Sequence, residues 1–196
     1  MSHDEENEHP LVDTFARIML VEVTRLGRVT PNIVEVTLAG ADLAAMPRLG
    51  PDAFVYVFPP RNGSPGHPIA RDFSWDAWRA LPEADRPVGR YYTIRRHRPR
   101  QGEVDLHMVL HGEGPLAEWA GSARRGDPVG LWGPRAAFQR PPRQTSFLLA
   151  SDEAGLPALA AILESLGPEA AGQAIIEASP ETHTYPLDPP PGLAVR

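Results

Sequence analysis

The spacing of apolar residues changes near residue 140, and this change restricts the chain to few folds. Before it, short segments rich in Val, Ile, Leu, Thr and aromatic residues are separated by Gly and Pro turns. These segments lie at residues 17–29, 32–38, 53–58, 90–98, 103–110 and 129–132. Many short strands with this punctuation are typical of an antiparallel barrel. The first part of the chain is therefore predicted to fold as a β barrel.

The second part has the pattern of one βαβ unit. Residues 145–150 form a continuous apolar run that suits a buried parallel strand, residues 156–166 have helical spacing, and residues 174–178 form another strand. The proline-rich residues 186–192 are predicted to be unstructured. We interpret the chain as a disordered acidic tail, a barrel domain and an α/β domain, at residues 1–14, 15–137 and 145–196.

The composition excludes several kinds of site. The 196 residues contain no Cys, which rules out disulfides, Cys-ligated zinc, a thiolate nucleophile and a protein-held iron–sulfur cluster. All 19 basic residues are Arg, so neither a P-loop nor a Schiff-base lysine is possible. His107 and His111 lie four apart on a strand, which is a poor spacing for a metal pair, and we predict no metal site.

Two further features bear on location and partners. No apolar run approaches the ~20 residues of a membrane helix, and the acidic N-terminus lacks a secretory pattern, so we expect a cytoplasmic protein without membrane insertion. Net charge is −6, yet residues 86–143 hold eleven Arg against five acids. A basic middle in an acidic protein indicates a local anion site rather than a nucleic-acid partner. For most of these Arg, a solvated position at a strand edge is the simpler interpretation.

The first motif with chemical content is Arg90-Tyr91-Tyr92-Thr93-Ile94-Arg95. Side chains two residues apart share one face of a strand, so Arg90 and Tyr92 lie together. Arg offers a bidentate fork to a phosphate, and Tyr offers a flat surface to a ring. By pattern alone, a Tyr packed on the barrel beside a solvated Arg is the favoured alternative.

The second motif covers residues 110–120 (LHGEGPLAEWA), where a strand leads into a short helix at residues 115–122. Gly112 and Gly114 allow the backbone to approach a ligand closely. The free N–H groups at the helix start favour a phosphate. A plain Gly-Pro turn before a helix is an equally good interpretation of this motif by itself.

In combination, these segments resemble the siderophore-interacting family of FAD-binding reductases, which is similar to ferredoxin reductases. Residues 90–95 look like the family's R-x-Y-T-[VI]-R. Further similar segments, in chain order, are WRALP at 78–82 with RP at 86–87, VLHG at 109–112, GP at 114–115, GDPV at 126–129, GP at 133–134 and SDEAGLPA at 151–158. The resemblance implies a Greek-key FAD-binding barrel followed by a shortened Rossmann-like NAD(P)-type α/β domain.

The resemblance also implies an activity and its site. The family reduces ferric siderophores in the bacterial cytoplasm, with NAD(P)H or a ferredoxin as electron donor. Arg90 would bind the FAD pyrophosphate, Tyr92 would stack on the isoalloxazine beside Tyr91, and Thr93 would lie near its N5 edge. The expected phosphate cradle and its surroundings comprise His111, Gly112, Gly114, Pro115, Leu116, Ala117 and Trp119. Asp152 and Glu153 belong to the NAD(P)-like part.

The chemistry of this reaction needs no acid–base residue, because a flavin converts a two-electron donor into single electrons for Fe(III). We therefore expect no catalytic side chain. Anionic siderophores would be attracted to Arg near the flavin, and the candidates are Arg95, Arg96, Arg98 and Arg135. For each of them, an exposed solvating Arg is an equally good interpretation.

The sequence departs from the family pattern at two places. Leu116-Ala117-Glu118 stands where the family usually has Ala-Ser-Arg, which removes a hydroxyl and a positive charge and adds a carboxylate. Ser151, Ala154 and Gly155 also differ from the usual residues. One βαβ unit is fewer than a complete nicotinamide-binding domain contains.

Two alternatives to a ferric-siderophore reductase therefore stay open. One is a siderophore- or flavin-binding module without turnover, and the other is a general flavin reductase or electron-transfer component.

Overall fold

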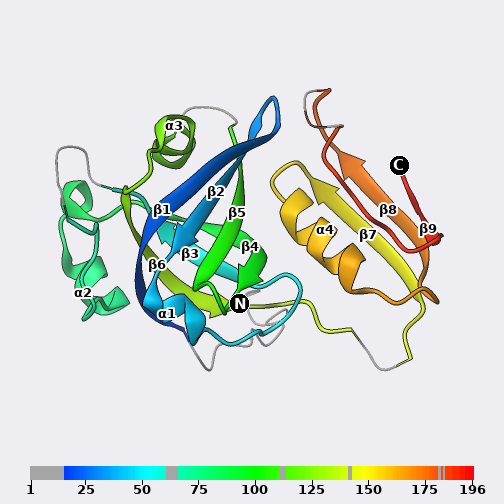
Figure 1. Ribbon diagram of the computed structural model, residues 1–196, viewed down its shortest axis with the longest axis horizontal. Helices are drawn as coiled ribbons and strands as arrows, with labels where there is room; N and C mark the ends of the chain where they lie inside the picture. The colour runs from blue at the N-terminus through cyan, green and yellow to red at the C-terminus, as the bar shows by residue number, and fades with distance from the viewer. Residues whose placement is uncertain (1–15, 61–65, 111–113, 141–142, 181, 183) are drawn as a thin grey trace, which may run out of the picture.

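The computed structural model describes residues 16–60, 66–110, 114–140, 143–180, 182 and 184–196. Within this part, six strands close into an antiparallel barrel with the order β1-β2-β5-β4-β3-β6 (Figure 1). The strands are β1 (Arg17–Thr30), β2 (Ile33–Ala39), β3 (Phe54–Phe58), β4 (Arg90–Arg98), β5 (Glu103–Val109) and β6 (Pro128–Arg135). The predicted barrel is confirmed, and each strand expected from the sequence is present.

The barrel interior is filled by alternate side chains of its strands. Met19, Val21 and Val23 of β1 are buried, and Leu106 and Met108 of β5 lie in the same cluster. This alternation follows from the pleat, which sends successive side chains to opposite faces. β4 sits between β3 and β5, so one of its edges is bonded to each neighbour.

The connection from β3 to β4 packs outside the barrel and carries two short helices, α2 (Trp75–Ala80) and the 3-10 turn η1 (Glu83–Asp85). Its Trp75 contacts Tyr56 of β3 and Trp132 of β6 edge to face. Edge-to-face aromatic pairs favour a fixed geometry. Trp75 therefore anchors the middle of this connection to β3 and β6.

Two helices lie close to the barrel strands. α3 (Pro115–Ser122) buries Leu116 and Ala120 in the barrel core, and it lies above the strands in Figure 1. α1 (Ala41–Ala44), which the sequence analysis did not predict, buries Leu43 in the same core. Pro at the first position of α3 suits a helix start, because its missing N–H would be unpaired there anyway.

The second part of the chain is a parallel sheet with one helix. β7 (Ser146–Asp152), α4 (Leu156–Ser165) and β8 (Ala171–Glu177) form the expected βαβ unit. β9 (Gly192–Val195) adds a third parallel strand beside β8. β9 was not predicted, and its first residue, Gly192, had been assigned to the unstructured segment at residues 186–192. Such a short segment after a proline-rich run has little strand signal of its own, and β8 supplies its pairing.

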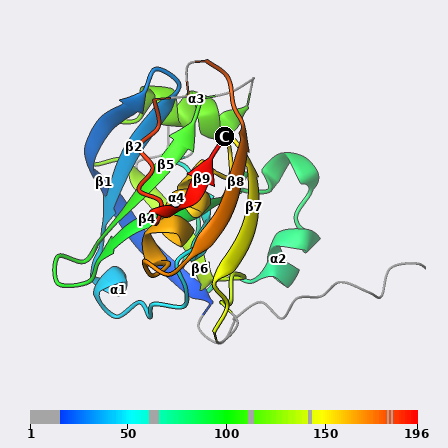
Figure 2. The same ribbon diagram turned by 90° about the vertical axis from the view of Figure 1, so that its right-hand side faces the viewer.

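Helix α4 lies between the sheet and the barrel (Figures 1 and 2). Leu156, Leu159 and Leu163 of α4 share a buried cluster with Ile33 and Val109 of the barrel. The opposite face of the sheet is open, and Leu148 there is 74% exposed. No helix among the described residues is long and apolar enough to cross a membrane.

Candidate functional site

The start of β4 presents the first motif at the barrel surface. Arg90 is exposed, whereas Tyr92 is half-buried against the barrel core. Gly89 permits this arrangement, because a Cβ at this position would overlap the Tyr56 ring and the Val57 carbonyl. The Arg90 guanidinium donates to the Gly89 carbonyl at 2.8 Å. Arg90 and Tyr92 therefore lie together, as their spacing predicts.

A slot of about 360 Å³ opens beside this strand, and we call it the ring slot. It is lined by side chains of β4, β3, β6 and α4, together with Asp52. These residues are Asp52, Phe54, Tyr91, Tyr92, Thr93, Arg135 and Ala158. Because Ala158 belongs to α4, the slot has one wall from the barrel and one from the α/β unit.

Two of the tyrosines of this region are protonated phenols at neutral pH. Burial raises the pKa of Tyr92, and Arg90 only partly opposes this effect. Burial likewise raises the pKa of Tyr56, whose phenol also interacts with Arg90. Tyr91 is 49% exposed and packs edge to face against Phe54 and Tyr56. The slot therefore offers aromatic surface with hydroxyl groups, together with one carboxylate, Asp52, whose Oδ2 accepts from the backbone N of Ala137 and of Phe138.

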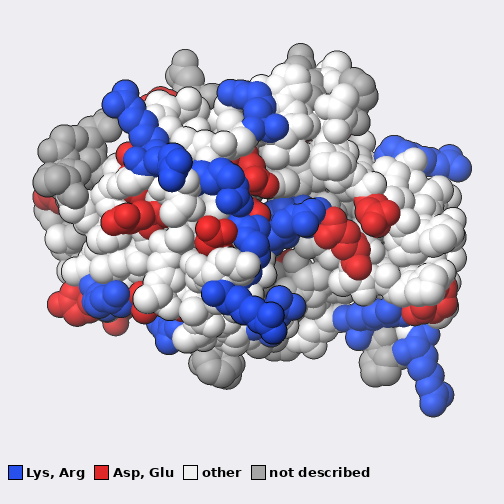
Figure 3. All heavy atoms as spheres, in the orientation of Figure 1, with Lys and Arg blue, Asp and Glu red and all other residues white. Residues whose placement is uncertain are grey.

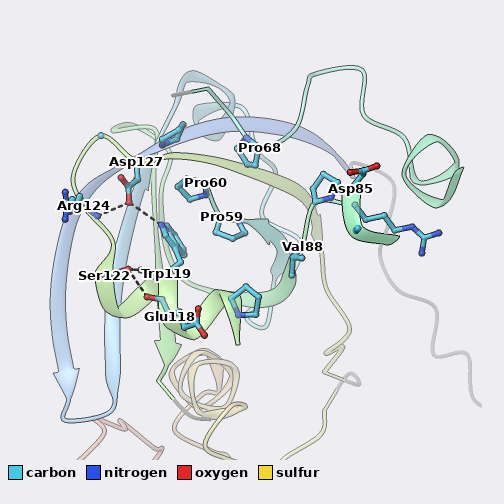
Figure 4. Close-up of a pocket in the computed structure, with 16 residues that line it drawn as sticks. Pro59, Pro60, Pro68, Asp85, Val88, Glu118, Trp119, Ser122, Arg124 and Asp127 are labelled. Carbon is cyan, nitrogen blue, oxygen red and sulfur yellow. Dashed lines mark hydrogen bonds between the residues drawn. The ribbon is translucent and has the colours of Figure 1, made fainter. Parts of the chain in front are cut away.

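On the other side of Arg90, a cavity of about 1000 Å³ lies between the β3–β4 connection and α3 (Figure 4). We call it the proline-lined cavity. It is lined by Pro59, Pro60, Pro68, Ala84, Asp85, Arg86, Pro87, Val88, Pro115, Glu118, Trp119, Ser122, Arg124, Gly126, Asp127 and Pro128. Residues 85–88, just before Arg90 in the chain, line this cavity, and residues 91–93, just after it, line the ring slot.

Trp119 is held in place at this cavity. Its indole Nε1 donates to Oδ2 of Asp127 at 3.2 Å, and the backbone N of Arg124 donates to the same oxygen at 2.9 Å (Figure 4). A buried indole N–H needs such a partner. The Asp127 carboxylate is thereby engaged in two hydrogen bonds. Glu118, by contrast, is exposed in the first turn of α3.

The start of α3 is open to a ligand within the described residues. Gly114 is its N-cap, with no side-chain hydrogen bond, and a Cβ there would meet nothing within 4 Å. Pro115 is exposed and Ala117 is half-buried, while the Leu116 side chain points into the core, so only its backbone faces the start. His111 and Gly112, both expected in the phosphate cradle, lie outside the described residues.

This arrangement fits FAD, which is a flat ring system joined through a diphosphate to an adenine nucleotide. The ring slot has aromatic walls, the larger cavity has space for a nucleotide, and Arg90 lies in the chain between residues that line the one and residues that line the other. An open helix start beside the cavity suits a phosphate. Two exposed carboxylates, Asp85 and Glu118, line the same cavity, together with Arg86 and Arg124. The residues present therefore match the chemistry of this cofactor.

The four candidate substrate cations have different surroundings. Arg95 is 6% exposed, and its guanidinium binds both carboxylate oxygens of Glu164 on α4. This corrects the expectation of an accessible Arg95, because its charge is compensated across the domain interface. Arg98 is paired with Glu103 and Asp105.

The other two candidates differ again. Arg96 is exposed, and no hydrogen bond or ion pair joins it to a described residue. Arg135 lines the ring slot and lies 5.5 Å from the Trp132 ring. Figure 3 shows Arg side chains gathered over the barrel and at its border with the α/β unit, with acids beside them. The excess of Arg at residues 86–143 is thus partly neutralised by acidic side chains that the fold places beside them.

A third opening, of about 610 Å³, is lined by residues of β4, of α4 and of the loop before β3. We call it the basic groove, because its charged lining comprises four Arg and one carboxylate: Arg48, Arg95, Arg96, Arg98 and Glu164. Sequence reasoning did not single out Arg48. It lies in the loop before β3, far from every motif, so only the fold brings it near Arg96.

The predicted NAD(P)-like pair has a structural role in the described chain. Oδ1 of Asp152 accepts from the backbone N of Gly155 at 2.9 Å, which shapes the turn before α4. Glu153 accepts from Asn32 of the barrel at 3.2 Å and from the backbone N of Ser179. Glu153 therefore joins the two parts of the molecule, and Asp152 is the more exposed of the two acids.

Two family models match this chain. The siderophore-interacting FAD-binding domain matches residues 22–138, and the siderophore-interacting protein model matches residues 144–196. An uncharacterized protein of Mycobacterium tuberculosis is 34% identical over 177 residues, which cover 89% of this chain and 62% of the relative. The chain thus spans about three fifths of that protein's length.

Two named relatives are ferric reductases. Ferric vibriobactin reductase ViuB of Vibrio cholerae is 30% identical, with 100% of this chain and 69% of the relative covered. NADPH-dependent ferric-chelate reductase of Escherichia coli is 29% identical, with 76% and 58% covered. Among solved structures, a siderophore utilization protein from T. fusca superposes with a TM-score of 0.78 at 25% identity, covering 94% of this chain and 70% of that one. Ferredoxin reductase in carbazole 1,9a-dioxygenase shares the fold, with a TM-score of 0.61 at 17% identity, covering 92% and 49%.

Proposed function

This chain belongs to the siderophore-interacting protein family, and from that premise we propose that it binds FAD and passes electrons to ferric iron held in a siderophore. The observation that carries the proposal is the position of Arg90 in the chain, just after residues that line a nucleotide-sized cavity and just before residues that line an aromatic slot. FAD consists of a flat ring and a nucleotide joined by a diphosphate, and it therefore needs an aromatic slot, a cation and a nucleotide-sized cavity.

The residues have distinct tasks in this proposal. Arg90 binds the diphosphate through charge-assisted hydrogen bonds, which are the strongest that a side chain offers to a phosphate. Tyr92 provides a face for the ring, and the Thr93 hydroxyl lies at its edge. The N–H groups at the start of α3 hold a second part of the diphosphate. Trp119, fixed by Asp127, bounds the nucleotide cavity.

FAD, when bound, takes up electrons in a pair and releases them singly. One two-electron donor therefore reduces two ferric centres, each of which takes one electron and becomes ferrous. Siderophores hold iron through hard oxygen ligands that suit Fe(III) better than Fe(II), so each single electron releases the metal. No proton transfer by a side chain is needed, and the side chains act by binding and orientation. We propose NADPH as the donor, in keeping with the name of the Escherichia coli relative.

The acceptor is an anionic ferric siderophore in the cytoplasm. Arg135 at the ring slot, with Arg48 and Arg96 in the adjoining basic groove, supplies positive charge near the ring. Arg95 and Arg98 contribute little to this attraction, because Glu164 and Asp105 neutralise them. Electrostatic attraction of this kind raises the rate of encounter and weakens with salt.

The test begins with an absorption spectrum of the purified protein, before and after incubation with FAD and gel filtration. The proposal expects retained flavin absorbance, and release of Fe(II) from a ferric siderophore when NADPH is added. Ferrous iron is measured with a colourimetric chelator. Protein that retains no flavin at saturating FAD contradicts the proposal. Equal rates with ferricyanide, ferric citrate and ferric siderophore would indicate a general flavin reductase instead.

A further inference from the structure

A cluster of polar groups joins the barrel to the α/β unit at the basic groove, whose lining includes Arg95 and Glu164. Arg95 of β4 donates from Nη1 to Oε2 of Glu164 at 3.0 Å, and its Nη2 binds Oε1 of the same carboxylate. The Arg95 side chain is 4% exposed and that of Glu164 is 37% exposed. A bidentate Arg–carboxylate pair fixes both distance and orientation.

Three more groups extend this contact. Tyr185, in the segment between β8 and β9, places its hydroxyl 2.7 Å from Nδ1 of His107 on β5. Nε2 of His107 lies 3.2 Å from Oε2 of Glu35 on β2. The Tyr185 hydroxyl also interacts with Arg95. We call these five residues the interdomain clamp.

The charge states of the clamp agree with its geometry. Burial alone would lower the pKa of Arg95, but its hydrogen bond to Glu164 outweighs burial and the pKa is raised. The same bond lowers the pKa of Glu164. Burial lowers the pKa of His107 and raises that of Tyr185 to about 12. At neutral pH the Arg95–Glu164 ion pair therefore lies beside the neutral imidazole of His107 and the neutral phenol of Tyr185.

The clamp and the ring slot are built on the same two rigid elements. β4 carries Thr93 of the slot and Arg95 of the clamp, two residues apart. α4 carries Ala158 of the slot and Glu164 of the clamp. Six residues of helix span about 9 Å. A change in the spacing of β4 and α4 at the clamp must therefore appear at the slot.

We propose that Arg95 and Glu164 are positioning residues that set the separation of α4 from β4, and thereby the width of the slot that receives the flavin ring. His107, Tyr185 and Glu35 hold Arg95 in the orientation that this pairing needs. The clamp rests on the proposed function, because the ring in the slot is the flavin. The proposal thus gives Arg95, a buried cation, a role in positioning rather than in direct contact with the cofactor.

The test compares three variants of the full chain loaded with FAD. Glu164→Gln removes the charge, and Arg95→Gln/Glu164→Gln removes the pair without leaving a buried charge alone. Glu169→Gln is the matched control, because the exposed Arg140–Glu169 pair lies away from β4. The readouts are bound-flavin fluorescence, the dissociation constant of FAD, the rate of iron reduction, and hydrogen exchange of α4 in the FAD-free protein.

Both clamp variants are expected to show brighter flavin fluorescence and faster exchange of α4, because the ring loses close contact with its aromatic neighbours. Reduction at saturating siderophore should fall about tenfold, as expected for a misplaced reacting group, while the FAD dissociation constant changes less than about threefold. The Glu169→Gln control should match the unaltered protein in every readout.

The outcomes separate the clamp from the proposed function. If the unaltered protein binds no flavin, the proposed function fails. If it binds flavin and Glu164→Gln leaves fluorescence, exchange and rate unchanged, the clamp is wrong. If Glu164→Gln changes them but the double variant restores them, the pair only compensates buried charge, and the positioning role is also wrong.

Discussion

The two halves of β4 use the same residue type in opposite ways. In the first half, Arg90 is exposed, and residues just before and just after it line the two cavities. In the second half, Arg95 and Arg98 have their charge neutralised by carboxylates, whereas Arg96 between them is exposed. The difference shows that an Arg becomes available to a ligand only where the fold brings no acid to it.

In the second half of β4, the pairing of Arg98 depends on Asp105, which is 2% exposed. Its carboxylate accepts from Thr37 at 2.7 Å and from Nη2 of Arg98 at 2.6 Å, and Arg25 lies 3.6 Å away. Burial alone would raise the pKa of Asp105, but the hydrogen bonds from Arg98 and Thr37 lower it. This cluster is therefore a stabilising element of the barrel and offers little charge to a ligand.

The largest effect is expected from Asp105→Ala, which tests the paired half. Removing the buried carboxylate leaves the Thr37 hydroxyl without its partner and leaves Arg98 with Glu103 alone, and the free energy of unfolding should fall by about 3–5 kcal/mol. Urea unfolding measures this change. Asp76→Ala is the control, because its pair with Arg79 is exposed and should contribute less than about 1 kcal/mol. Equal losses in the two variants would contradict the distinction.

A smaller effect, on binding rather than folding, is expected from Arg90→Ala in the open half. Loss of the charge-assisted contacts should weaken FAD binding by about 1.5–3 kcal/mol. The FAD-free protein should unfold within about 0.5 kcal/mol of the unaltered one, since Arg90 is a surface residue. Titration of flavin fluorescence measures the affinity. An unchanged FAD affinity would remove Arg90 from the site.

The pH dependence of stability gives a third test of the paired half. The pKa of His107 is lowered from 6.5, so the unfolded chain binds a proton first and stability should decline as pH falls below about 6.5. Among the groups around it, Glu35 and Asp105 oppose this shift and Arg95 reinforces it, with Tyr185 and Glu164 also nearby.

The lowered pKa of Glu164 adds to the same trend, because its contribution is present above 4.5 and is lost as pH falls through the lowered value. Urea unfolding at a series of pH values measures the decline. His107→Gln should flatten the slope between pH 6.5 and 5, relative to the unaltered protein. An identical slope would mean that His107 does not titrate differently on folding.

The smallest effect is expected from Arg96→Gln, which tests an exposed cation of the basic groove. Its loss should raise the KM for an anionic ferric siderophore by up to about fivefold, as is usual for an exposed charge. The difference should disappear in high salt, because exposed charges are screened. Arg100→Gln, at the exposed turn after β4, is the matched control. The same change in both variants would show that the groove has no special role.

Much of the fold followed from local pattern. The apolar runs at residues 103–110 and 145–150 predicted β5 and β7, and the helical spacing after residue 156 predicted α4. β9 could not be found in this way, because a four-residue strand is stabilised by its neighbour rather than by its own sequence. Arg90 and Tyr92 were identified because their spacing along one strand already places them on one face, whereas Thr93, on the other face, was named from the family resemblance.

By itself, the sequence determined the six barrel strands, the βαβ unit and the motif that lies beside the ring slot. Only the tertiary structure decided which Arg is neutralised. The partner of Arg95 is Glu164, 69 residues away in the sequence. Arg48 and Arg96, also distant in the sequence, both line the basic groove. The physical reason is that periodicity depends on neighbours within a few residues, whereas the charge available at a site depends on every group that folding brings within a few ångströms.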